Sequence, residues 1–121
     1  MDKKHKYILY TFIKFVEKEL DIEDTFTFSM SSNRKGFKTY AYYDPQEKKV
    51  AVYIKNRGLA DICRSVAHEL VHHLQNQRGD LKNGEPVQDI GGNIEDEANA
   101  VAGQLIKKFG YQHPDMNIYV I

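Results

Sequence analysis

Apolar residues recur at steps of three and four in three stretches of the chain, which is the spacing of one buried helix face. The first stretch runs from about residue 4 to 21, with the lysines at 14 and 18 on the opposite side. The second runs from Leu59 to near Gly79, and the third from about residue 94 to 109. The pattern therefore predicts three amphipathic helices.

Three short segments rich in β-branched and aromatic residues lie between the first and second predicted helices, at 25–32, 38–44 and 48–55. Turn-forming residues separate them, and such short connections favour an antiparallel meander. Residues 110–121 are compatible with one more extended segment. The sequence thus predicts one α+β domain over residues 1–121, with an N-terminal helix, a small antiparallel sheet of about three strands and two further helices.

Charge and composition exclude several classes of protein. The 17 basic and 17 acidic residues cancel, which gives no electrostatic basis for binding nucleic acid. No stretch approaches the roughly 20 apolar residues of a membrane span. The basic and then apolar N-terminus is interrupted by Lys14 and Glu17, unlike a signal peptide, and the single cysteine forms no internal disulfide. We therefore expect a soluble, cytoplasmic protein.

The second predicted helix contains the sequence His68-Glu69-Leu70-Val71-His72. Residues four apart on a helix project about 40° from each other, so the two imidazoles can bind one metal ion. Glu69 lies about 100° round from His68, where its carboxylate can serve as a base without being a ligand. Chance placement gives this H-E-x-x-H pattern in roughly one per cent of shuffled chains. We therefore expect a zinc site built on His68 and His72, with Glu69 as general base.

The alternative is a helix that is simply rich in histidine, with solvated or capping side chains. His73 fits this alternative better than the metal site, because it lies about 100° round from His72 and outside the metal face.

A catalytic zinc usually takes three protein ligands, so a third is needed. Glu95 and Asn99 lie four apart in the third predicted helix and share a face. Glu95 would complete the ligand set, and Asn99 would accept a hydrogen bond from the far nitrogen of a ligand imidazole. Glu97 is a poorer candidate ligand and is not excluded. Alternatively, the acidic residues at 95–97 only favour the helix dipole.

Together these two helices resemble the gluzincin metallopeptidases, in which HExxH is followed on a later helix by Glu with Asp or Asn four residues on. The stretch EDEANAVAGQL (95–105) is similar to the ImmA/IrrE-type branch, although Val71 stands where a glycine is common. The resemblance covers residues 59–106. It implies a zincin-like fold with zinc between two active-site helices, bound by His68, His72 and Glu95, and with Glu69 as base.

The resulting hypothesis is a zinc metallopeptidase that cleaves a peptide or protein substrate, which would add as a strand at a sheet edge near residues 50–54. Tyr111 and His113 are the candidate donors to the oxyanion. The glycine-rich loop 79–93 would act as a lid over the cleft. The alternative hypothesis keeps the zinc but not the turnover, and gives a zinc-stabilised regulatory or interaction protein. An intact Glu69 argues against it, because a purely structural site needs no base.

Overall fold

The computed structural model describes residues 1–81, 92–116 and 118. Over these residues the protein is α+β, with three α-helices and a three-stranded sheet, which confirms the predicted class and order of elements. The elements are α1 (Lys3–Glu19), β1 (Thr27–Ser31), β2 (Ala41–Asp44), β3 (Lys49–Tyr53), α2 (Leu59–Gln77), α3 (Asn93–Gln112) and the 3₁₀-helix η2 (Pro114–Met116).

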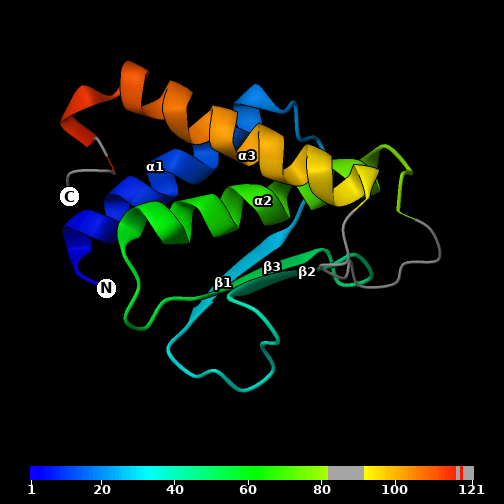
Figure 1. Ribbon diagram of the computed structural model, residues 1–121, viewed down its shortest axis with the longest axis horizontal. Coiled ribbons are helices and arrows are strands. Elements are labelled where there is room, and N and C mark those ends of the chain that lie inside the picture. Colours follow the sequence, from blue (N-terminus) through cyan, green and yellow to red (C-terminus); the bar gives the residue numbers. More distant parts are fainter. Residues whose placement is uncertain (82–91, 117, 119–121) are drawn as a thin grey trace.

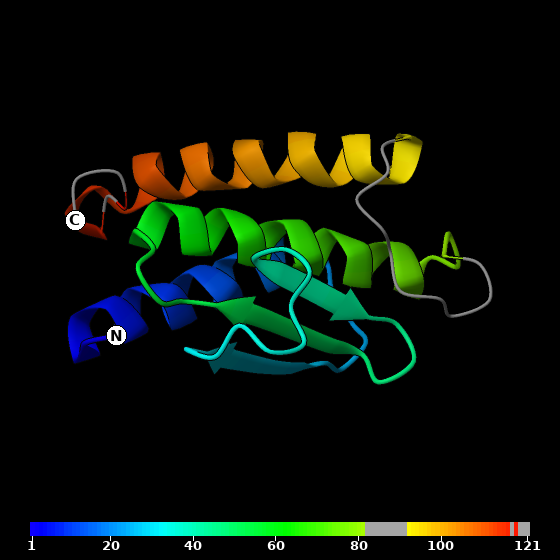
Figure 2. The same cartoon turned by 60° about the horizontal axis from the view of Figure 1, so that its bottom comes forward.

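The elements form layers around one apolar core. Figure 2 shows the sheet at the bottom, α1 and α2 across one of its faces, and α3 lying along α2 on the side away from the sheet. In Figure 1 the N-terminal end of α1 and the C-terminal end of α3 lie on the same side of the molecule. Helix α2 is therefore packed between the sheet and α3, and this explains why eleven of its 19 residues are buried.

The sheet is mixed, and the predicted antiparallel meander is wrong. The strand order is β1-β3-β2, with β3 antiparallel to β2 and parallel to β1. The physical reason lies in β3, in which three successive residues are buried: Val50, Ala51 and Val52. Because successive side chains point to opposite faces, both faces of the sheet are covered at this strand. A strand with an uninterrupted apolar centre is best placed in the middle, where both of its edges are also paired.

The central position of β3 also moves the expected substrate edge. Residues 49–53 are hydrogen-bonded on both sides and cannot receive another strand. Within the described part of the chain, β2 is the edge strand that packs against α2. A peptide that adds to the sheet beside α2 would therefore pair with residues 41–44.

Arg57 fixes the start of α2 against the sheet. Its guanidinium donates hydrogen bonds to the carbonyl of Tyr53, at the end of β3, and to the carbonyl of Asp61 and the hydroxyl of Ser65 in α2. It also lies over the Tyr40 ring, with 4.7 Å from the guanidinium carbon to the ring centroid. The β3–α2 connection is thus held by a charged side chain that bonds to both elements.

Helix α3 is longer than predicted and the tail differs from the prediction. The helix continues through Gly110 to Gln112, and residues 114–116 form a 3₁₀ turn where the sequence was compatible with an extended segment. A helical glycine costs about 1 kcal/mol relative to alanine, and the packing of Phe109 on the core offsets this cost. The predicted lid, residues 79–93, falls mostly outside the described residues.

Cys63 belongs to the core and not to the polar face of α2. Burial raises the pKa of its thiol to about 12, so the side chain is a neutral, small apolar group near neutral pH. None of the helices described is long and apolar enough to cross a membrane.

We expect Phe109→Ala to lower the free energy of unfolding by about 3–5 kcal/mol, because Phe109 is fully buried and its ring contacts those of Phe12 and Phe15. Tyr111→Ala is the matched control. This aromatic residue of the same helix is 77% exposed, and its loss should change the stability by no more than about 0.5 kcal/mol. Urea unfolding followed by circular dichroism measures both. Equal effects would contradict the placement of α3.

Candidate metal centre

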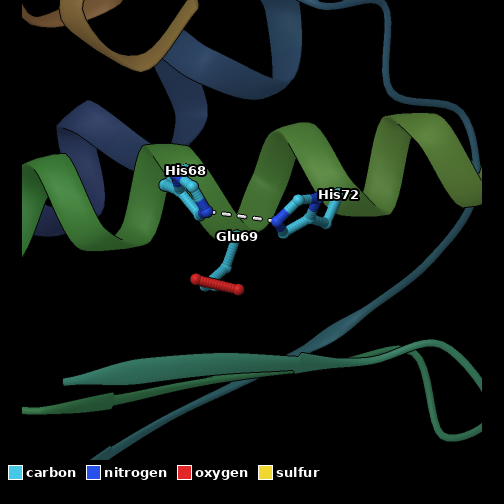
Figure 3. A group of neighbouring side chains, drawn as sticks. All are labelled: His68, Glu69 and His72. Carbon is cyan, nitrogen blue, oxygen red and sulfur yellow. Dashed lines mark hydrogen bonds between the residues drawn. The ribbon is translucent and has the colours of Figure 1, made fainter. Parts of the chain in front are cut away.

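His68, Glu69 and His72 come together on α2, as the HExxH spacing predicts. Figure 3 shows the two imidazole rings turned toward each other along the helix, with Glu69 between them and pointing toward the sheet. The two Nε2 atoms are 3.1 Å apart. One carboxylate oxygen of Glu69 and one nitrogen of each histidine all lie within 4.8 Å of one another. These three side chains could therefore surround a metal ion.

Glu95, in the first turn of α3, faces the same two nitrogens. Its Oε1 is 2.7 Å from His72 Nε2, and its Oε2 is 3.2 Å from His68 Nε2. The two imidazoles and the carboxylate group thus form a triangle of three groups, in which the closest atoms are 2.7, 3.1 and 3.2 Å apart and each histidine faces a different carboxylate oxygen. Tetrahedral zinc with ligands at about 2.05 Å separates any two ligand atoms by about 3.3 Å. Two imidazoles and one carboxylate at these separations fit the donor set of a catalytic zinc.

Burial differs around the cluster. The side chains of His72 and Glu95 are 1% and 6% exposed, whereas that of His68 is 14% exposed. Within the described residues the cluster is therefore most accessible near His68. Glu69 is also buried, and its side chain points toward the sheet from its position between the two histidines (Figure 3).

Gln75 is a polar residue of the site that the sequence pattern did not reveal. It is fully buried, and its Oε1 lies 2.7 Å from Nδ1 of His72. Asn99, the predicted partner of a ligand imidazole, is exposed on α3. For His72 that prediction is wrong, because α3 turns Asn99 outward while Gln75, one turn beyond His72 on its own helix, reaches the ring. The sequence signal was the spacing of three residues, which places Gln75 next to His72 on the helix surface.

Glu97 is not directed at the histidines. Its carboxylate accepts hydrogen bonds from Gln75 Nε2 and from Arg78. The hydrogen bond from Gln75 has the largest effect and that from Arg78 the next largest, and together they hold the pKa of Glu97 below its ordinary value. This residue therefore stays ionised near neutral pH. Among the acidic residues at 95–97, Glu95 is therefore the one in contact with both imidazoles.

Tyr111 and His113, the predicted oxyanion donors, lie at the wrong end of α3. Tyr111 follows Glu95 by sixteen positions in one continuous helix, a distance of about 24 Å along the axis. Tyr111 is exposed, and the His113 ring packs against those of Phe109 and Phe15. The predicted helix ended near residue 109, and its continuation to Gln112 keeps both residues far from Glu95.

His73 lies outside the metal face, as its angle on the helix predicts, but it is buried and not solvated. Its Nε2 donates to the carbonyl of Asp24, and its Nδ1 accepts from the hydroxyl of Tyr43. Asn76 donates to the same hydroxyl. Burial raises the pKa of Tyr43, so its hydroxyl remains a donor. His73 thus ties α2 to β2 and to the segment before β1.

No protein-family model, curated protein or solved structure matches the chain.

We expect His73→Leu to lower the free energy of unfolding by about 2 kcal/mol while one metal ion per chain is still bound. The change keeps most of the volume but leaves the Tyr43 hydroxyl and the Asp24 carbonyl without their buried partner. Urea unfolding in the presence of a chelator measures the stability, and elemental analysis of metal-loaded protein measures the stoichiometry. Loss of metal with unchanged stability would place His73 in the metal site instead.

Proposed function

We propose that this protein is a zinc-dependent metallopeptidase of the gluzincin type with a zincin-like fold, closest to the ImmA/IrrE-like branch. The observation that carries the proposal is the triangle of His68 Nε2, His72 Nε2 and a Glu95 carboxylate, contributed by two different helices. Three protein ligands leave one coordination position of a tetrahedral zinc for water or substrate, which is the arrangement of catalytic sites.

The position of Glu69 supports hydrolysis over a purely structural role for the metal. Its carboxylate is within 4.8 Å of both histidine nitrogens, and its side chain points toward the sheet (Figure 3). A base in this place can take a proton from water that attacks a peptide carbonyl, and then pass it to the leaving nitrogen. Zinc bound by the triangle would supply Lewis-acid activation of the water and the carbonyl.

The edge position of β2 in the sheet supports a peptide as the class of substrate. β2 is an edge strand among the described elements and packs beneath α2 on the side to which Glu69 points. An extended peptide that pairs with residues 41–44 would be held by backbone hydrogen bonds. Such binding depends little on the side chains of the substrate, so the proposal is a peptidase with broad sequence tolerance on a protein or peptide chain.

We expect the purified protein to bind one zinc ion per chain, His72→Ala to lose it, and Glu69→Gln to keep it. Hydrolysis of a fluorescently labelled, unfolded protein such as casein should fall by about 10²- to 10⁴-fold in Glu69→Gln, because only the proton transfer is impaired. Elemental analysis and the fluorescence assay measure the two effects separately.

The three proteins together separate the possible functions. Zinc in the wild type and in Glu69→Gln, with no difference in hydrolysis, would support a zinc-stabilised interaction protein and contradict the peptidase. No zinc in the wild type after incubation with the metal would contradict both. Glu47→Gln is the matched control for the charge change, because Glu47 lies in the turn between β2 and β3.

A further inference from the structure

Both ends of the Gln75 side-chain amide are engaged in the buried region between α2 and α3. Oε1 lies 2.7 Å from Nδ1 of His72, and Nε2 lies 3.0 Å from the carbonyl of Ile94 and 2.9 Å from Oε1 of Glu97. Gln75 has no exposed surface. One side chain of α2 therefore contacts a candidate metal ligand on its own helix and the first turn of α3.

The partners of Nε2 fix the orientation of this amide. A backbone carbonyl and an ionised carboxylate only accept hydrogen bonds, so the NH₂ group must face Ile94 and Glu97, and both of its hydrogens are used. The amide oxygen then faces His72, and a carbonyl oxygen only accepts. Consequently, His72 carries a proton on Nδ1 and donates it to Gln75, which leaves Nε2 as the nitrogen available to bind a metal.

The hydrogen bond from Gln75 Nε2 to the Ile94 carbonyl helps to hold Glu95 in position. The Ile94 carbonyl immediately precedes Glu95 in the chain, and Gly92 at the start of α3 has no side chain with which to cap the helix. The bond from Gln75 therefore ties the turn that carries Glu95 to the helix that carries both histidines. Arg78 extends this tie, because it donates to the Glu97 carboxylate that Gln75 also contacts.

We propose that Gln75 is a positioning residue of the metal centre, which holds His72 as the Nδ1–H tautomer and holds the Glu95 turn against α2. This inference rests on the proposed function, since it assumes that the triangle binds zinc. Gln75 itself touches neither the metal nor the substrate. Its effect is on how well two of the three ligands are oriented before the metal binds.

Gln77 provides a matched control on the same helix. Its Oε1 accepts from the backbone N–H groups of Glu23 and Asp24, and its Nε2 donates to the carbonyl of Asp21. Gln75→Met and Gln77→Met therefore both remove amide hydrogen bonds to a neighbouring segment at nearly constant volume. Only Gln75→Met removes a contact with a candidate metal ligand, His72.

Two measurements test the positioning role. We expect zinc affinity, determined by chelator competition, to fall about 10- to 100-fold in Gln75→Met and to remain near the wild-type value in Gln77→Met. In zinc-free protein labelled with ¹⁵N-histidine, the His72 Nδ1–H proton should give a slowly exchanging resonance. This resonance should persist in Gln77→Met and be lost in Gln75→Met.

Gln75→Glu keeps the test valid if Gln75→Met does not fold. It retains an oxygen that accepts from His72 but loses both donors to α3, so the Nδ1–H resonance should be retained. Loss of that resonance in Gln75→Glu, or zinc affinity in Gln75→Met equal to that in Gln77→Met, would overturn the positioning role alone. Failure of the wild type to bind zinc would overturn the proposed function, and the positioning role with it.

Discussion

The burial of the Glu95 carboxylate against α2 is the constraint on which the site depends. A carboxylate removed from water is costly unless nearby groups compensate it, and here the two imidazoles of α2 lie at 2.7 and 3.2 Å from its oxygens. The contact requires α2 and α3 to lie close together at this end. Ala98 and Ala102, which are both fully buried, provide that closeness because they add little bulk between the helices. The triangle of two imidazoles and a carboxylate and the two buried alanines thus belong to the same α2–α3 interface.

Helix α2 is the element through which the rest of the fold acts on this interface. Arg57 ties its start to the sheet, and His73 and Asn76 tie its second half to β2 through the Tyr43 hydroxyl. At its end, Gln77 binds the backbone before β1. These bonds limit how far α2 can rotate about its axis. A rotation would carry His68 and His72 away from Glu95, so the orientation of these candidate ligands is set partly by residues that never touch them.

The sequence predicted the parts of the site that depend on local helical geometry. His68, Glu69 and His72 needed only the helical period, and Glu95 needed only a second helix with a carboxylate in its first turn. Tyr111 and His113 were misplaced because the predicted third helix ended near residue 109, whereas packing on the core keeps the helix intact through Gly110.

The strand order and Gln75 were missed for a different reason. Short connections favour sequential antiparallel pairing, but the order in a sheet also depends on which strand buries the most apolar surface, and β3 does so here. A glutamine near the end of an amphipathic helix is usually solvated. Its burial follows only from the position of α3, which covers it and supplies two acceptors. Both features depend on tertiary contacts that spacing along one element does not contain.

The distribution of buried polar groups supports a functional reason for this interface over a purely structural one. In the parts of the chain that the structure describes, the buried polar and charged residues are all on α2 or in the first turn of α3: Glu69, His72, His73, Gln75 and Glu95. Apolar residues of similar size would pack α2 against α3 at least as stably, because buried charged pairs often contribute no net stability over them. His73 is explained by its bonds to Tyr43 and Asp24. Of the other four residues, His72, Gln75 and Glu95 lie where α2 meets α3, and Glu69 lies beside the histidines and points toward the sheet. The metal ion that we propose, with Glu69 as its base and Gln75 as its positioning residue, accounts for all four of them.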